Sequence, residues 1–174
     1  MFDLTSGQQW MLWSIRITVL LYIARYVIVF VSRRQRPVDR TRECWVWTIA
    51  WCCYCAHVLL AFHFVHDWSH YVAWQHTADE TARVTGIRRG DGVWVNYAFT
   101  LAWLADVIRI WAYRTRPQAA ASKLSFAFQA AFAFIVFNAT VVFGPPIYRY
   151  LAVPVAGGLF WIWKRPGVQR ESES

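Results

Sequence analysis

Long blocks of apolar residues, separated by short polar stretches, dominate the pattern along this chain. A helix needs about 20 mostly apolar residues to cross the hydrocarbon layer of a membrane, and several blocks approach that length. The apolar positions fill each block instead of recurring on one face, as they would in a soluble amphipathic helix. The pattern therefore predicts an all-α fold, a polytopic transmembrane helix bundle.

Five spans are expected. They cover residues 10–32, 44–66, 93–113, 124–143 and 147–163. The fifth block is shorter and is interrupted by Pro154, Gly157 and Gly158, so a bent span, a re-entrant piece and an interfacial helix all remain open for it. We expect residues 1–174 to form a single transmembrane domain.

One connection, residues 67–92, is much longer than the others. Its middle, residues 69–84, contains good helix formers and predicts a short helix. The glycines that follow, from Gly86 to Gly92, predict a turn, because glycine adopts backbone angles that other residues resist. The polar tail, residues 169–174, is expected to be disordered.

Basic residues are divided unequally between the two sides of the predicted bundle. Eleven Lys and Arg fall in the first connection, the third connection and the tail, against four in the alternate segments. Basic loops stay on the cytoplasmic side of a membrane. The N-terminus is therefore expected outside, the C-terminus inside, and the long connection outside.

Composition agrees with a membrane protein and disfavours a nucleic-acid partner. The chain is 57% hydrophobic and only 16% charged, whereas soluble proteins carry about a quarter charged residues. The net charge of +8 comes from arginines in short loops, which is the orientation signal described above. Most of the 12 tryptophans lie near block ends, where membrane proteins place aromatic belts, and Trp103 is the mid-span exception. We expect the lipid bilayer as partner and a bacterial inner membrane as location.

All five histidines fall within residues 57–76. If the second span continues as a helix beyond the membrane surface, His63, His66 and His70 share one face, since each residue advances about 100°. Imidazole is a common ligand of Zn, Cu and Fe. The spacing predicts a transition-metal site, at which Asp67 could ligate the ion or orient a ring.

His76 joins this cluster only if the long connection folds back, and His57 lies elsewhere on a straight helix. A b-type haem is the more specific alternative, and it would need His76 or a partner chain to supply the second axial ligand. An unliganded hydrogen-bond network also remains open. The stretch from His66 to His70 is one partial box of the kind found several times in membrane di-iron enzymes, so that class is disfavoured.

Charged residues inside two expected spans predict an internal ion pair, because an ionisable group in a membrane usually has a partner. Asp106 and Arg25 each lie about seven residues from the inner end of their spans. We expect them to pair, with Arg109 competing or adding to the network. A structural lock between helices is favoured over a proton path.

Polar residues near the outer ends of three expected spans predict a shared polar pocket at the depth of the histidines. They are Arg16, Asn96, Tyr97 and Asn138. Polar side chains at such positions can bridge helices by hydrogen bonds.

The stretch His63-Phe64-Val65-His66-Asp67-Trp68-Ser69-His70, with His76-Thr77, Asn96-Tyr97 and Asn138-Ala139-Thr140, resembles a family of small, uncharacterised bacterial multi-spanning membrane proteins. The resemblance would cover most of the chain. It implies a membrane bundle and carries no activity.

The sequence contains no recognisable catalytic signature, so whether the chain is an enzyme stays open. The leading hypothesis is an outer-leaflet metal site that serves metal handling, electron transfer or a larger redox complex. The alternatives are a non-enzymatic accessory subunit and a haem protein. Other membrane subunits or further copies of the chain are possible partners.

Overall fold

Every regular element is a helix in the computed structural model, which describes residues 6–32, 40–115, 123–142, 144 and 146–164. The helices are α1 (Ser6–Ser32), α2 (Thr41–Phe64), α3 (His70–Thr85), α4 (Gly92–Ala112), α6 (Lys123–Phe137) and α7 (Ile147–Lys164), and the π-helical turn η1 (Asn138–Val142) continues α6. The prediction of an all-α fold is confirmed. The tail 169–174 lies outside the described residues.

Three helices are long and apolar enough to cross a membrane: Gly7–Phe30, Thr41–Phe64 and Gly92–Ala112. Two further apolar helices are shorter, Phe128–Val142 and Ile147–Ile162. Pro154 lies inside α7 without ending it. The described helices thus support membrane association, and their apolar faces are compatible with lipid contact in a membrane.

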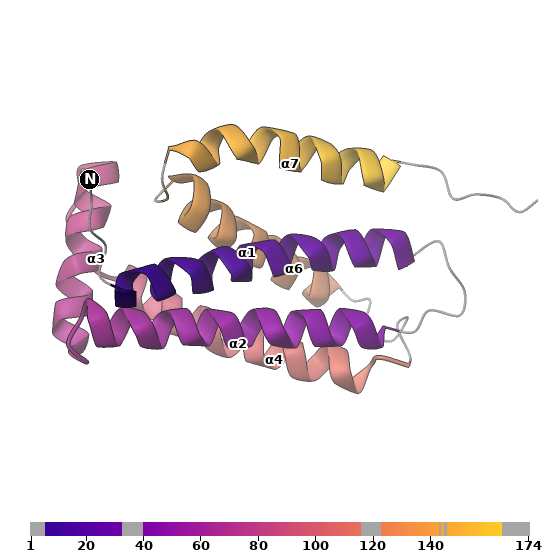
Figure 1. Ribbon diagram of the computed structural model, residues 1–174, viewed down its shortest axis with the longest axis horizontal. Coiled ribbons are helices and arrows are strands. Elements are labelled where there is room, and N and C mark those ends of the chain that lie inside the picture. Colours follow the sequence, from indigo (N-terminus) through magenta and orange to yellow (C-terminus); the bar gives the residue numbers. More distant parts are fainter. Residues whose placement is uncertain (1–5, 33–39, 116–122, 143, 145, 165–174) are drawn as a thin grey trace, which may run out of the picture.

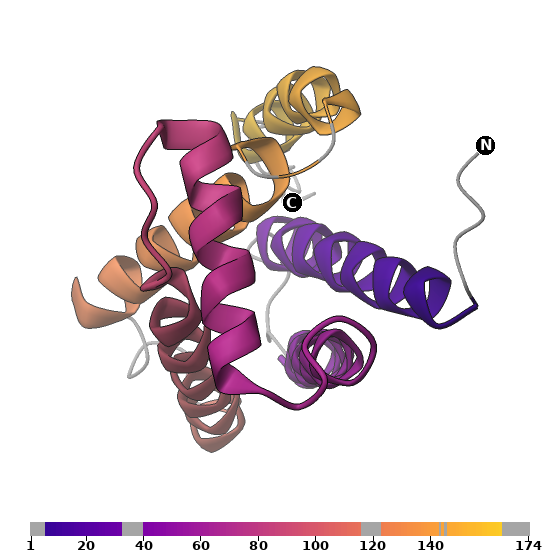
Figure 2. The same ribbon diagram turned by 90° about the vertical axis from the view of Figure 1, so that its left-hand side faces the viewer.

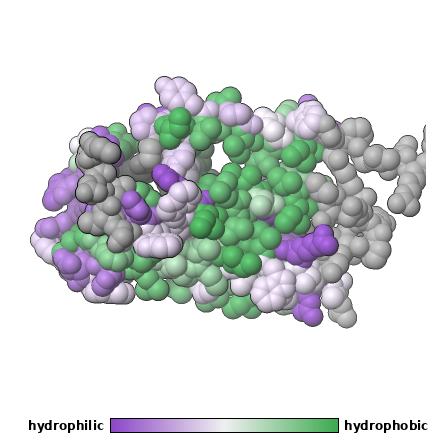
Figure 3. Space-filling model, viewed as in Figure 1, coloured by the Kyte–Doolittle hydropathy of each residue, from purple (hydrophilic) through white to green (hydrophobic). Residues whose placement is uncertain are grey.

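The long helices lie side by side, and α3 crosses one end of them. α1 packs along α2, α4 packs on α2, and α7 lies beside α1. Figure 2 shows α3 lying in front of the other helices when the bundle is seen from that end. We call this the α3 end. Hydrophobic residues cover most of the middle of the face shown in Figure 3, while hydrophilic ones gather over α3.

The break between α2 and α3 is set by two residues with left-handed backbone angles. Asp67 has φ 46° and Trp68 has φ 56°, a conformation that costs non-glycine residues energy and is incompatible with a continuing helix. Ser69 is the N-cap of α3, and its Oγ accepts a hydrogen bond from the Val72 N–H at 3.3 Å, as serine commonly does at this position. The chain therefore turns sharply between His66 and His70.

Two glycines fix how the chain leaves α3 and returns along it. Gly86 has φ 77° and caps the helix, as glycine commonly does at this position. Gly90 lies so close to α3 that a Cβ atom there would approach the Trp74 carbonyl oxygen to 2.5 Å. The connection to α4 is therefore held against α3.

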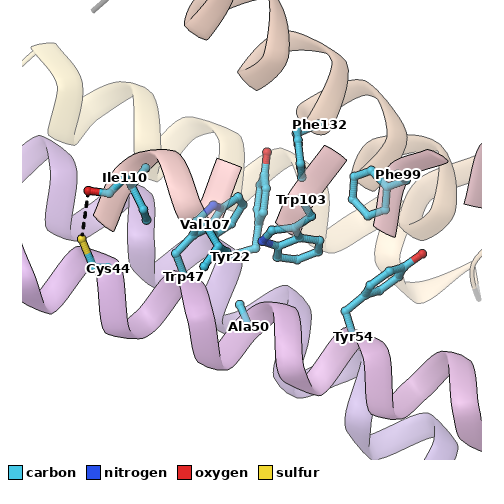
Figure 4. Packing of buried hydrophobic residues seen from close by; sticks show 10 residues of the cluster. All are labelled: Tyr22, Cys44, Trp47, Ala50, Tyr54, Phe99, Trp103, Val107, Ile110 and Phe132. Carbon is cyan, nitrogen blue, oxygen red and sulfur yellow. Dashed lines mark hydrogen bonds between the residues drawn. The ribbon is translucent and has the colours of Figure 1, made fainter. Parts of the chain in front are cut away.

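Aromatic rings form the core where α1, α2, α4 and α6 meet (Figure 4). Trp47 and Trp103 are almost fully buried and their ring centroids lie 4.7 Å apart. Phe132 of α6 contacts both rings. Trp47 therefore belongs to the core and not to an interfacial belt, while Trp10, Trp13, Trp45 and Trp94 are exposed near helix ends.

Candidate functional site

The structure does not bring His63, His66 and His70 together. α2 ends at Phe64, and the left-handed residues Asp67 and Trp68 redirect the chain, so the three histidines do not share a helical face. No group of three or more His, Cys, Asp or Glu side chains lies in a metal-binding arrangement within the part of the chain that the structure describes. The expectation that the three histidines share one helical face is therefore wrong, because it assumed an uninterrupted helix.

His66 and His76 are the two histidines that do meet. Their ring centroids lie 5.4 Å apart with an interplanar angle of 59°. α3 folds back over the end of α2, and this brings a residue ten positions later against the loop. His66 is partly buried and His76 is exposed, so the pair has one sheltered ring and one ring open to solvent.

The Nδ1 atom of His66 is buried and has no hydrogen-bond partner among the described residues. Burial, with a smaller contribution from the nearby His76, lowers the pKa of His66 from its usual value. Both effects favour a neutral ring with an available lone pair, and a neutral imidazole is the form that binds a metal.

The remaining histidines are engaged elsewhere. The Nδ1 of His63 accepts a hydrogen bond from the indole of Trp68 at 3.3 Å. The Nδ1 of His57 lies 2.9 Å from the carbonyl oxygen of Met11, which ties α2 to α1. His70 lies against α4, as described below, and Asp67 is exposed in the turn.

A second cluster of polar and aromatic groups joins α3 to α4. The Nδ1 of His70 lies 3.0 Å from the hydroxyl oxygen of Tyr97. The His70 ring also packs against Trp94, with centroids 4.9 Å apart. His70 therefore helps to hold α3 across the bundle. Sequence reasoning missed this role because it assigned His70 to the metal site and Tyr97 to the polar pocket.

Toward the opposite end, four helices contribute to a charged network made of Arg25, Glu43, Asp106, Arg109 and Gln129. Arg25 donates to Glu43 at 3.0 Å and to the amide oxygen of Gln129 at 2.9 Å. Arg109 donates to Asp106 from both Nε (2.9 Å) and a terminal nitrogen (2.6 Å). Arg25, Glu43 and Asp106 are each at most 5% exposed.

Asp106 and Arg25 are joined through other residues and not by a direct ion pair. Gln129 donates to Asp106 at 3.1 Å while its oxygen accepts from Arg25. Trp47 provides a second link, since its Nε1 donates to Asp106 at 2.9 Å and its face lies 4.1 Å from the Arg25 guanidinium carbon. The expected direct pair is thus replaced by a bridged one, because Glu43 lies closer to Arg25.

Sequence reasoning missed Glu43, Gln129 and Trp47. Glu43 lies one residue before the expected start of the second span, and it therefore looked like part of a loop. The sequence signal for Glu43 was its position three residues after Arg40, a spacing that suits an ion pair on a helix. In the structure Arg40 does donate to Glu43, at 2.6 Å. Gln129 could have been found as an amide within an apolar block, since such groups seek partners across helices.

The four residues of the expected polar pocket do not share one. Arg16 is exposed and lies over the ring of Trp13. The side-chain nitrogen of Asn138 donates to the carbonyl of Phe134 at 2.8 Å, and Tyr97 lies against His70. Asn96 lines a cavity, and there it accepts a hydrogen bond from Tyr54.

Comparisons with protein-family models, with curated protein sequences and with solved structures found no significant match. The resemblance of the histidine segment to small bacterial membrane proteins gains no support from them. The functional proposals therefore rest on the residues of this chain.

Proposed function

We propose that this chain is an integral protein of a bacterial inner membrane that binds a transition-metal ion at the α3 end and serves in metal handling. In this proposal α1, α2, α4, α6 with η1, and α7 form five spans, with the N-terminus and the α3 end outside and the C-terminus inside. The distribution of basic residues supports this orientation. The three long apolar helices support the membrane location.

The observation that carries the metal site is the His66–His76 pair. Metal–nitrogen bonds to imidazole measure about 2.0–2.1 Å, so two nitrogens that share an ion lie roughly 3.3–4.1 Å apart. Ring centroids at 5.4 Å come within side-chain rotation of that arrangement. The unpartnered Nδ1 of His66 would gain the metal ion as a partner. This would offset the free-energy cost of burying an unpaired nitrogen atom.

A site with two protein ligands suits transient binding better than a permanent cofactor. Structural zinc sites are closed by four protein ligands and catalytic ones by three. Two histidines leave positions for water or for a donor from another protein. Because His76 is exposed, such a donor could reach the ion. These features favour metal handling over electron transfer.

Metal titration of the full chain tests the proposal. Protein purified in detergent through a histidine-free tag, and stripped of metal, is titrated with Zn²⁺ and with Cu²⁺ and analysed for bound metal. We expect one ion per chain. His66→Ala and His76→Ala should each weaken binding by tenfold or more, because either change leaves a single imidazole.

His63→Ala and His70→Ala are the matched controls, since they remove histidines of the same segment that lie outside the pair. They should leave metal affinity within about twofold of the parent protein. Absence of stoichiometric binding, or equal losses in all four variants, would contradict the proposal. A visible spectrum recorded on the untreated protein tests the haem alternative, which requires a Soret band.

A non-enzymatic accessory subunit is the second candidate function. The observation that favours it is the exposure of α7, where Tyr150 is 76% exposed and Val153 is 74% exposed. Such a helix has apolar surface available to the membrane segments of another protein. Co-purification of a stoichiometric membrane partner, lost when Tyr150 and Val153 are replaced by larger residues, would support this role.

A further inference from the structure

Two tryptophans meet across α2 and α4 at the end of the bundle opposite the α3 end. The ring centroids of Trp45 and Trp111 lie 5.2 Å apart at an interplanar angle of 88°. The two helices are joined here, because the Nε1 of Trp111 donates to the hydroxyl of Thr48 on α2 at 2.9 Å. The rings therefore form an aromatic surface that two helices share, and nothing described so far gives it a function.

Two arginines border this pair of rings. The guanidinium carbon of Arg114, which follows the end of α4, lies 5.8 Å from the centroid of the Trp111 ring. Arg42 lies three residues before Trp45 on α2, and residues at this spacing are neighbours on the surface of a helix. Both arginines are exposed. We call Arg42, Trp45, Trp111 and Arg114 the arginine surface.

Neither arginine of this surface has a carboxylate partner among the described residues. Arg42 makes no hydrogen bond or ion pair with them, and the side chain of Arg114 donates only to the backbone carbonyl of Trp111. The acidic side chain nearest to Arg42 in sequence, Glu43, is 4% exposed and already binds two other arginines. The arginine surface thus presents two uncompensated positive charges beside two aromatic rings.

This combination of groups suits a molecule with a phosphate and an apolar body. The planar guanidinium matches the oxygen atoms of a phosphate, and tryptophan rings in membrane proteins lie at the level of the lipid headgroups. Apolar surface continues along both helices, since Ile49 of α2 is 47% exposed and Ile108 of α4 is 60% exposed. Acyl chains could cover these side chains.

We propose that the arginine surface binds an anionic phospholipid, with its phosphate on Arg114 and Arg42 and its acyl chains along α2 and α4. The inference rests on the membrane location proposed above. In the proposed orientation this end faces the cytoplasm, where the membrane surface carries anionic lipids. The adjoining connections, residues 33–40 and 113–122, hold six Arg and one Asp, so charge favours an anionic headgroup. A choline headgroup would instead place another positive charge beside the arginines.

Native mass spectrometry of the full chain, freed of lipid in detergent, tests this proposal. Phosphatidylglycerol and phosphatidylcholine with identical acyl chains are titrated in separate experiments, and the dissociation constants of the first bound lipid are compared. We expect phosphatidylglycerol to bind at least about fivefold more tightly. Inorganic phosphate at the same concentration should not displace it, because phosphate has no acyl chains.

Three variants complete the test. Arg114→Gln should reduce the preference for phosphatidylglycerol to about twofold or less, whereas Arg114→Lys should retain most of it, because lysine also binds phosphate as a point charge. Arg16→Gln is the matched control. Arg16 is also exposed and lies 5.2 Å from the ring of Trp13, but both residues belong to α1 alone. This control should leave the preference unchanged.

Four results would overturn the proposal: equal affinity for the two lipids, displacement by inorganic phosphate, an unchanged preference in Arg114→Gln, or an equal loss in Arg16→Gln. Should Arg114→Gln fail to fold, the comparison of the two lipids in the parent protein still decides.

The membrane location is tested separately, by extraction of reconstituted vesicles with alkaline carbonate. Protein that resists extraction but shows no lipid preference would count against the arginine surface alone. Metal binding at His66 and His76 lies at the other end of the bundle and is measured independently.

Discussion

The indole nitrogen of Trp47 donates a 2.9 Å hydrogen bond to Oδ2 of Asp106, and this bond joins α2 to α4 inside the bundle. Both side chains are almost fully buried. A hydrogen bond to a buried carboxylate is among the stronger kinds, because the ionised acceptor has no water to replace a lost donor.

Trp47→Phe should therefore destabilise the protein by about 1–3 kcal/mol, since the ring is retained and the donor is lost. Unfolding in mixed detergent micelles measures the change. Trp45→Phe is the matched control on the same helix, because Trp45 is 55% exposed, and it should cost less than about 0.5 kcal/mol. Equal losses in the two variants would show that the bond to Asp106 contributes nothing.

Glu43→Gln should be more damaging, because it leaves Arg25 buried without its charged partner. Breaking a buried ion pair by removing one member costs about 3–5 kcal/mol. A second change, Arg25→Met, should recover part of the loss. The exposed ion pair Arg83–Glu80 supplies the control, since Glu80→Gln should cost at most about 1 kcal/mol. If adding Arg25→Met lowered the stability of the Glu43→Gln variant further, the broken ion pair would not explain the loss of stability.

Stability at the α3 end should fall as the pH is lowered. The pKa of His66 is lowered in the folded protein, so the unfolded chain takes up a proton at a higher pH than the folded chain does. The stability is fully present above the unfolded pKa, and it is lost as the pH falls through the folded pKa. Thermal unfolding between pH 7.5 and 5 should show this loss. His66→Gln should flatten the dependence, and an unchanged slope would be evidence against it.

Gly90→Ala should loosen the connection between α3 and α4. The added Cβ would approach the Trp74 carbonyl oxygen to 2.5 Å, and overpacking of this kind costs about 1–3 kcal/mol. Faster hydrogen exchange in α3 would report the change. Gly157→Ala is the matched control. It should stabilise the protein, because nothing is found within 4 Å of the added Cβ and alanine favours a helix interior. Equal effects at both positions would refute the close-approach argument.

Much of the fold could be predicted from the sequence, because apolar block length and glycine placement are local signals. The helix in the long connection was expected from residues 69 to 84, and α3 covers His70–Thr85. The end of α2 was not anticipated. Nothing in the residue types of Asp67 and Trp68 requires left-handed angles, and an uninterrupted helix looked equally acceptable.

The site was harder to predict than the fold, since it depends on how helices are placed against one another. Asp106 and Arg25 were expected together, and they do belong to one network. Their partners in the structure include Glu43 and Gln129. These contacts depend on how each helix is rotated and on the depth at which it lies, and residue spacing predicts neither. For the same reason the sequence favoured His70 as a ligand, whereas packing brings His76 to His66.

The charged network also bears on how the chain enters a bilayer. Arg25 and Glu43 belong to consecutive helices, so the α1–α2 hairpin carries its own neutralising partner. Asp106 and Arg109 lie three residues apart on α4 and neutralise each other within one helix. In the proposed membrane location, each of these ion pairs can therefore enter the bilayer as a neutral unit, before the rest of the chain has been made. Gln129, which is uncharged, arrives last and links the two neutral units into one assembly.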